Sequence, residues 1–544
     1  MRVAVVGGGP GGLFLATLLR RADPSMQVSV FERNRADDTF GFGVVFSDRT
    51  LAAIHDADPV LREALATRGR HWDAIEVRLK GERIRCGGNG MAAIARRTLL
   101  GLLQERAGDV GAELRFSTEV GLDDLAGYDL VVAADGTGSR IRRETGADLG
   151  ETVETATAKF VWFGTEYLFD GLTFVHERGP DGVFAVHGYP ISDTVSTFIV
   201  ETDEASWRRA GLDEFDVTQP PGVSDLKTKE YLEKLFAEQI DGRRLLVNNS
   251  RWGNFRTRRT RRWQVTDPRP VAFLGDAVHT AHFSVGSGTK MAMEDAVALA
   301  AALVAHTGDL AVALGVYEEA AQPSVRRIQD SARPSLAWWE HVGRYHDAFE
   351  PWQFAYHFLS RSISDARLAR RAPEFVAASH RGWVDAHGAD PLDTPFTAGG
   401  WSVPGRRVEV DTDGGTPLAA RAGDDRTDAD REPGTAQPRD LPLRDAPPAG
   451  DGPWGLRLAA PDTEAGLATT FATLAGAAAG PQPPAIVAVH GGTALTRILL
   501  AEQARLHDRV PALLIEPDLD DDRAVTAVLS GRADLVARTP DGRP

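Results

Sequence analysis

Segment 2–33 constrains the fold more than any other part of this 544-residue chain. A short apolar run leads into Gly7, Gly9 and Gly12. An apolar-periodic stretch follows, and a second apolar run ends at Glu32, 20 residues after the last of these glycines. This order predicts a strand, a tight glycine turn, a helix and a second strand that ends at an acid. We therefore expect a Rossmann-like α/β fold that binds a dinucleotide.

Each residue type in this turn suits a pyrophosphate. Gly7 permits the tight turn, Gly9 lets the backbone approach the phosphates, and Gly12 allows the helix to pack closely on the strand. Glu32 can bind the hydroxyls of an adenosine ribose. The same site is expected to include Pro10, Gly11 and Arg33. The alternative is a glycine-rich turn without a ligand.

Two later segments repeat the pattern of a buried-type strand that ends at an acid. One strand precedes Asp135-Gly136, and the other precedes Gly275-Asp276. A glycine-rich turn and an Ala- and Met-rich helix follow the second acid, and the free amides and positive dipole end of such a helix suit an anion. A reduced flavin combines a ribityl chain with an anionic ring. Alone, either segment could be an ordinary turn. The cofactor contacts expected from the glycine-rich turn are Gly286, Ser287, Gly288, Thr289 and Lys290.

Residues 37–48 alternate glycines with aromatics, which lets a backbone lie close to a flat group. From this segment we expect Val44 to contact the cofactor and Phe46 to contact the substrate, although Phe46 could also simply fill the core. Arg96 lies near the start of a predicted helix. It could reach a pyrophosphate or remain a surface charge.

Taken in order, the three motifs resemble those of the single-component flavoprotein monooxygenases that hydroxylate aromatic rings. Longer segments are similar to the acyl-CoA branch of that family, which comprises salicylyl-CoA 5-hydroxylases and the monooxygenase half of 2-aminobenzoyl-CoA monooxygenase/reductases. These segments are FERNRADDTFGFGVVFSD, KFVWFGTEYLFDGLTF, GDAVHTAHFSVGSGTKMAMEDA and RIQDSARPSLAWWEHVGRYHDAFEPWQFAYHFLSRS. The resemblance covers roughly residues 1–380.

The resemblance implies FAD as the cofactor, NAD(P)H as a transient co-substrate, O2 as the oxidant and no metal. It also implies that a flavin hydroperoxide hydroxylates an activated aromatic ring. The substrate would be a salicylyl-CoA or 2-aminobenzoyl-CoA type thioester, attacked para to its hydroxyl or amine. An indolic or carrier-bound aromatic intermediate is the alternative substrate. A non-catalytic flavin-binding protein is the second alternative.

The resemblance further implies the layout of para-hydroxybenzoate hydroxylase, in which a mixed β-sheet for the substrate is inserted into the FAD-binding domain. We expect the FAD-binding domain at residues 1–155 and 243–330, and the substrate sheet at 156–242. A helical region at 331–390 should follow.

Alternating apolar and polar residues between 158 and 203 predict strands of this substrate sheet. In this family the sheet covers the flavin. The side chains expected to contact the ring are Trp162, Phe174, Phe184 and Phe283. His187 and Tyr189 are two residues apart, so they should share one face of a strand, where their polar tips could address a phenol or amine. We regard these two as the catalytic candidates. Plain sheet core is the alternative for the aromatic residues.

The composition changes after the helical region. Residues 391–453 are expected to be a linker, because the chain from Val408 to Asp451 is rich in Asp, Arg, Pro and Gly. Residues 454–544 are expected to form a small α/β domain. DTPFTAGGWSVPGRRV and IEPDLDDDRAVTAVLSGRADLVA resemble parts of an old-yellow-enzyme barrel. Such a barrel needs about 250 residues, so we expect a shortened remnant without a second flavin site. A thioredoxin-like domain is the alternative.

A basic segment, RTRRTRRW at Arg256–Trp263, stands out on a chain with a net charge of −16. It could attract the phosphates of a coenzyme A ester or of NADPH, because guanidinium groups match phosphate oxygens. It could also be a solvated strand face.

The overall charge and composition exclude several classes of binding partner and site. The net charge of −16 argues against nucleic acid and anionic membranes. A single cysteine, Cys86, excludes an internal disulfide and a multi-cysteine metal site. No signal peptide pattern is visible, and no apolar run approaches the ~20 residues of a membrane span. We expect a cytoplasmic enzyme that could form a homodimer.

Overall fold

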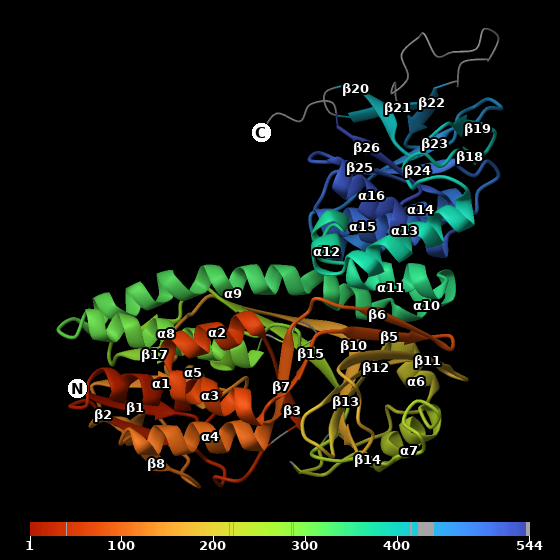
Figure 1. The fold of residues 1–544 in the computed structure, drawn as a ribbon. Coiled ribbons are helices and arrows are strands. Elements are labelled where there is room, and N and C mark those ends of the chain that lie inside the picture. Colours follow the sequence, from red (N-terminus) through yellow and green to blue (C-terminus); the bar gives the residue numbers. More distant parts are fainter. Residues whose placement is uncertain are drawn as a thin grey trace. The chain divides into compact units, whose positions relative to one another are not determined.

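The computed structural model describes residues 1–39, 41–216, 218–220, 222–283, 286, 288–413, 416–422 and 440–539. They form two compact units, Met1–Gly343 and Arg344–Pro544 (Figure 1). Ser287, which we expected to contact the cofactor, lies outside the described residues.

The first unit is built on a six-stranded sheet of order β16-β17-β9-β1-β2-β8. Its strands are β1 (Arg2–Val6), β2 (Gln27–Phe31), β8 (Glu113–Arg115), β9 (Leu130–Ala133), β16 (Gln264–Val265) and β17 (Val271–Phe273). All neighbours are parallel except β16 and β17. The central strands β1 and β9 are continuous apolar runs, as a parallel sheet covered on both faces requires. The predicted Rossmann-like domain is confirmed.

Helices pack around this sheet. They are α1 (Pro10–Ala22), α4 (Arg96–Asp109), α5 (Arg140–Glu144), α8 (Gly288–Ala305) and α9 (Leu310–Glu340). The N-terminal helix α1 packs against both α4 and α8, and α8 packs against the long α9 (Figure 1). A three-stranded sheet of β3 (Gly43–Ser47), β7 (Met91–Ala95) and β4 (Arg70–Trp72), with α2 (Asp48–Ala57) and α3 (Pro59–Arg68), completes this part.

The second sheet of the first unit has eight strands. They are β5 (Ile75–Leu79), β6 (Glu82–Cys86), β10 (Glu151–Thr165), β11 (Leu172–Gly179), β12 (Gly182–Pro190), β13 (Ser196–Thr202), β14 (Leu245–Leu246) and β15 (Gly253–Thr260). The short helices α6 (Glu204–Arg209) and α7 (Leu226–Leu235) follow β13. The sheet extends beyond the expected range 156–242, because β5 pairs with β11, and β15 pairs along the length of β10.

The second unit begins with helices and continues as a sheet. The helices are α10 (Val342–Ala348, which spans the boundary), α11 (Pro351–Leu359), α12 (Asp365–Arg371) and α13 (Pro373–His387). The seven-stranded sheet follows chain order, with β20 (Val408–Asp413), β21 (Thr416–Ala422), β22 (Leu441–Arg444), β23 (Gly455–Ala459), β24 (Ile486–His490), β25 (Ala512–Glu516) and β26 (Leu535–Arg538). Three helices, α14 (Leu467–Ala478), α15 (Ala494–Glu502) and α16 (Asp521–Leu529), alternate with the parallel strands β23 to β26.

This sheet returns to its own beginning. Arg407, just before β20, forms a parallel bridge with Val536 of β26, whose amide donates to the Arg406 carbonyl at 2.9 Å. Inward side chains such as Val410, Leu443 and Leu513 share one buried core. The result is a small closed barrel, and its origin as an old-yellow-enzyme remnant stays a prediction.

The expected linker at 391–453 was therefore wrong for much of its length. Two short strands, β18 (Phe396–Ala398) and β19 (Trp401–Val403), and the barrel strands β20 to β22 lie within it. The few apolar residues of this polar segment alternate along short strands, and their side chains fill the barrel. The average composition of the segment does not reveal this alternation.

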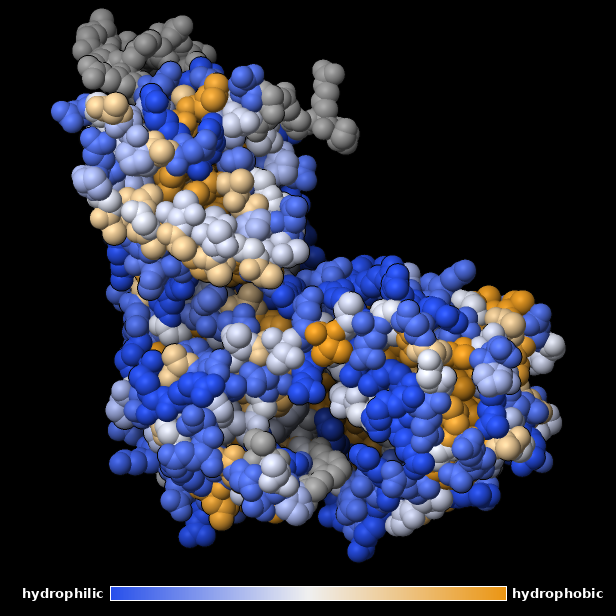
Figure 2. Space-filling view, turned by 180° about the vertical axis from the view of Figure 1, so that it is seen from behind, coloured by the Kyte–Doolittle hydropathy of each residue, from blue (hydrophilic) through white to orange (hydrophobic). Residues whose placement is uncertain are grey.

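The surface of the first unit is largely polar. Hydrophilic residues predominate on the face of this unit seen in Figure 2, and hydrophobic residues reach the surface in separate groups. Exposed apolar side chains of this unit include Val60, Leu168 and Leu226. Across the described part of the chain, no helix has both the length and the hydrophobicity to span a membrane.

Candidate active site

The glycine turn after β1 has the geometry that the sequence predicts. Gly7 has φ +116°, and a β-carbon there would lie 2.2 Å from the Ala134 carbonyl oxygen. A β-carbon at Gly12 would lie 2.2 Å from the Gly7 carbonyl oxygen. Both positions therefore require glycine. Gly9, at the N-terminus of α1, faces open space within 4 Å, so a pyrophosphate can approach the first amides of the helix.

Neighbouring residues divide between packing and binding. Pro10 starts α1, where its missing amide hydrogen costs nothing. A β-carbon at Gly11 would lie 2.4 Å from the Leu274 side chain, so this glycine serves helix packing. The Glu32 carboxylate accepts from the Gly8 amide at 2.8 Å, which fixes it beside the turn. Arg33 is exposed.

Two further acids lie at the ends of adjacent parallel strands, Asp135 after β9 and Asp276 after β17. Gly136 and Gly275 have φ +79° and +62°, so each chain turns sharply beside its acid. Asp135 accepts from the Arg140 amide at 2.7 Å through Oδ2, and its buried Oδ1 has no partner among the described residues.

Arg96 is close enough to Asp276 for their charges to interact. It opens α4, and its buried Nε has no hydrogen-bond partner in the described part of the chain. Burial lowers the pKa of Arg96, while the charges of Tyr189 and Asp276 oppose this shift. Burial also raises the pKa of the Asp276 carboxyl, which His279 and Arg96 partly offset. Asp276 is itself exposed to solvent, which weakens this desolvation.

These features fit FAD. The unmatched Arg96 Nε can donate to its pyrophosphate, Glu32 can bind its ribose, and Asp276 can bind its ribityl chain. The turn after Asp276 contributes Gly286, with φ +61°, and α8 starts at Gly288, next to Thr289. Lys290 instead pairs with Glu294 at 2.7 Å along the same helix.

One face of the second sheet carries the expected ring contacts. Phe174, His187, Ile199 and Trp162 are direct cross-strand neighbours in that order, so their side chains share this face. Phe283, from the loop that follows Asp276, lies with its ring centroid 5.6 Å from Trp162 and 5.7 Å from His187. An aromatic wall is thus assembled from the second sheet and the loop that follows Asp276.

Tyr189 lies on the same face, two residues from His187. Its hydroxyl donates to the Gly43 carbonyl at 3.5 Å, which ties the second sheet to β3. Burial raises the pKa of Tyr189 to about 12. The phenol therefore stays protonated near neutral pH and can donate a hydrogen bond, but it is a poor base.

Two expected substrate contacts were wrong because they lie on the other face of their strands. Phe184 packs against Tyr231 of α7, with a centroid distance of 5.4 Å, on the side opposite to His187. Phe46 is buried in the core of the first sheet. The Val44 side chain shares that core, whereas Val45 between them faces the aromatic cluster. The expected contact of Val44 with the cofactor stays a prediction.

The structure adds residues that sequence reasoning missed. Glu201 lies on the same sheet face, with Oε1 2.9 Å from Nε2 of His187 and Oε2 3.6 Å from Nε2 of His282. All three side chains are buried. Trp339 of α9 lies 4.5 Å from the His187 ring. In the sequence, one signal could have placed Glu201 on this face. Alternate residues of a strand share a face, and Glu201 is two residues from Ile199 in β13.

Comparisons with known proteins agree with this geometry. A family model described as FAD binding domain matches residues 1–332. Salicyloyl-CoA 5-hydroxylase from a Streptomyces species is 56% identical, covering 99% of this chain and 100% of the relative. The 3-hydroxy-4-methyl-anthranilyl-(aryl-carrier protein) 5-monooxygenase of Streptosporangium sibiricum is 36% identical, covering 62% of this chain and 89% of the relative.

A solved structure shows the same fold. P. aeruginosa PqsL in complex with 2-aminobenzoylacetate has a TM-score of 0.50 and 22% identity, covering 64% of this chain and 98% of PqsL. The family match spans more than half of the chain, and the first relative spans nearly all of it. The chain therefore belongs to the FAD-binding aromatic monooxygenases.

Proposed function

We propose that this enzyme hydroxylates the aromatic ring of salicyloyl-CoA or a closely related acyl-CoA thioester, with NAD(P)H and O2 as co-substrates. The observation that carries the proposal is the buried face on which His187 and Glu201 lie among Trp162, Phe174 and Phe283. A relative named for the salicyloyl-CoA reaction, 56% identical over 99% of the chain, supports it.

When bound beside Glu32, Arg96 and Asp276, FAD would carry electrons from NAD(P)H to O2, which is the oxidant. One oxygen atom of O2 enters the ring and the other leaves as water. The protein positions the ring and excludes water. Trp162 and Phe283 provide a flat apolar wall for an aromatic substrate.

In this proposal, His187 accepts the phenolic proton of the substrate. Loss of that proton makes the ring carbon para to the oxygen more electron-rich. Glu201, 2.9 Å from the His187 ring, stabilises the imidazolium that forms. General-base assistance of this kind is typically worth about 100- to 10,000-fold. Tyr189, protonated at neutral pH, is suited to donate a hydrogen bond.

A carrier-bound aromatic substrate is the second candidate. It is favoured by the relative named for an aryl-carrier protein substrate, which is 36% identical. That relative covers 62% of this chain, whereas the salicyloyl-CoA relative covers 99%. The alignment with the salicyloyl-CoA relative therefore includes the second unit, and this favours the coenzyme A ester over the carrier-bound substrate.

The test is NAD(P)H consumption by the FAD-loaded protein with salicyloyl-CoA, 2-aminobenzoyl-CoA and the two free acids, with products weighed by mass spectrometry. Stimulation by an ester alone, with the gain of one oxygen atom, supports the proposal. If all four compounds leave consumption unchanged, the acyl-CoA assignment is wrong and carrier-bound substrates become the next to test.

A further inference from the structure

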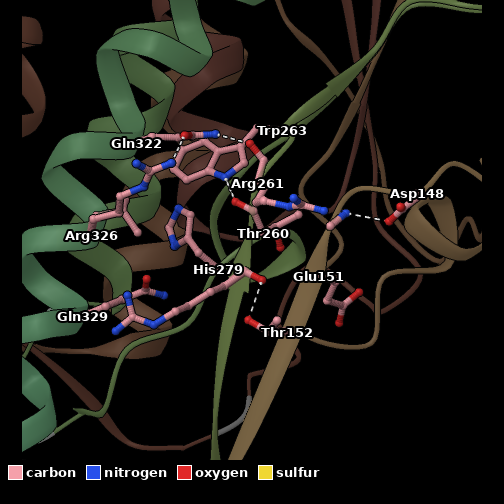
Figure 3. A pocket seen from close by; sticks show the side chains of 13 residues that line it. Asp148, Glu151, Thr152, Thr260, Arg261, Trp263, His279, Gln322, Arg326 and Gln329 are labelled. Carbon is pink, nitrogen blue, oxygen red and sulfur yellow. Dashed lines mark hydrogen bonds between the residues drawn. The ribbon is translucent and has the colours of Figure 1, made fainter. Parts of the chain in front are cut away.

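The first unit holds a cavity of about 510 Å³ whose lining includes none of the aromatic wall residues Trp162, Phe174, His187 and Phe283 (Figure 3). Its walls come from the start of β10, the end of β15 and the middle of α9. Gln322 donates to the Arg261 carbonyl at 2.7 Å, and Gln329 donates to the Arg258 carbonyl at 2.7 Å. These bonds fix the end of β15 against α9, so the cavity is held open by rigid elements.

Arginines make the lining of this cavity positively charged. Arg261 and Arg326 both line it, and among the described residues neither guanidinium forms an ion pair. Within the described part of the chain, the Arg326 guanidinium donates only to the neutral Gln322, at 2.7 Å. Arg262 lines an adjoining hollow and also lacks an ion pair within the described ranges. Unpaired guanidiniums are unexpected on a chain with a net charge of −16.

Two acids near the cavity pair with other arginines, and a third bonds to a backbone amide. Glu151 binds Arg258 at 2.7 Å and Arg142 at 3.3 Å. Asp330 pairs with Arg259 at 2.9 Å. Asp148 accepts from the Gly150 amide at 2.8 Å. The cations that remain are therefore available to an anion from solution.

His279 supplies an independent sign of a ligand. It is buried in the cavity wall, and its ring lies beside Trp263, Gln322 and Arg326 in Figure 3. Nε2 lies 2.7 Å from the Asp295 carboxylate, while the buried Nδ1 has no hydrogen-bond partner in the described residues. A buried polar atom without a partner is rare unless a ligand or water meets it.

We propose that this arginine pocket, defined by Arg261, Arg326 and His279, binds a phosphate group of a nucleotide. The proposal rests on the proposed function, which supplies two sources of such a group, the coenzyme A part of the thioester and the 2′-phosphate of NADPH. Guanidinium groups bind phosphate with short, charge-assisted hydrogen bonds. Trp263 and the two glutamines complete a wall with apolar and polar surface.

Calorimetric binding to the FAD-loaded protein tests the proposal without turnover. The ligands are coenzyme A, 3′-dephospho-coenzyme A, NADPH and NADH. They are compared for wild type, Arg261→Ala/Arg326→Ala and Arg243→Ala. Arg243 is an exposed arginine of the same unit without an ion pair among the described residues, so it controls for loss of surface charge. Each lost guanidinium contact should raise the Kd about 10-fold.

If the double variant binds coenzyme A more weakly than wild type and Arg243→Ala do, the pocket is assigned to the thioester. Weaker binding of NADPH, with NADH unchanged, assigns it to the co-substrate. If the double variant and wild type bind all four ligands equally, or wild type binds none, the pocket proposal is overturned. Absence of ester hydroxylation with a retained difference in binding would instead reject the proposed function alone.

Discussion

Replacing Glu201 by glutamine tests the proposed proton path with little change of shape. The Glu201 carboxylate is 2.9 Å from Nε2 of His187. At this distance, and at an effective dielectric constant of about 20, its attraction to an imidazolium amounts to about 6 kcal/mol. A neutral amide retains part of this interaction, so we expect a net loss of about 2–3 kcal/mol. Hydroxylation should then slow roughly 30- to 150-fold.

Rapid-mixing kinetics separate this effect from a general defect. FAD reduction by NAD(P)H and the Kd of the thioester should change little in Glu201→Gln, while the yield of hydroxylated product per NAD(P)H falls. A ring-fluorinated salicyloyl thioester has a more acidic phenol and needs less help from a base. It should therefore recover part of the lost rate.

Glu177→Gln is the matched control. Glu177 lies on the opposite face of the same sheet, where it accepts from Gln239 at 2.7 Å, and burial raises its pKa. Its loss should leave the product yield intact. Equal yields from wild type and Glu201→Gln would refute the role of the carboxylate. An equal loss with the ordinary and fluorinated substrates would show that Glu201 does not act through the phenolic proton.

Three further substitutions address the cofactor site. Gly7→Ala forces an alanine to φ +116° and against the Ala134 carbonyl oxygen, so the purified protein should contain little FAD, as its absorbance will show. Arg96→Met removes a partly buried cation that forms no ion pair among the described residues, and should raise the Kd for FAD about 10- to 100-fold by fluorescence titration. Asp276→Asn removes the carboxylate expected to bind the ribityl hydroxyls, so it should raise the Kd for FAD about 10-fold in the same titration; an unchanged Kd would contradict this.

The motifs that the sequence predicts well are those in which backbone conformation demands one residue type. Gly7 and Gly12 cannot carry a β-carbon, and Gly275 turns with φ +62° between β17 and Asp276. Such positions leave a signal that one sequence can show. The Rossmann-like sheet followed from them because strands that bring their acids to one site must run parallel in one sheet, as β2, β9 and β17 do around β1.

The side-chain contacts were less predictable, because a shift of one residue moves a side chain to the other face of a sheet. Phe184 and Phe46 are aromatic and buried, as a ring contact would be, yet they point away from His187. Glu201, in contrast, is a contact that the sequence does not suggest. An acid in an apolar run resembles a surface position, and only the packing of His187 and His282 on either side shows that it is buried.

Asp295 connects the two sites of the first unit. Its buried carboxylate accepts from the Gly275 amide at 2.9 Å and lies 2.7 Å from His279 Nε2. Gly275 precedes the acid expected to bind the ribityl chain of FAD, and His279 lines the arginine pocket. Because one carboxylate orients both, the short segment from Gly275 to His279 cannot shift at one site without strain at the other. The Gly-Asp motif thus fixes the position of the arginine pocket as well as that of the cofactor.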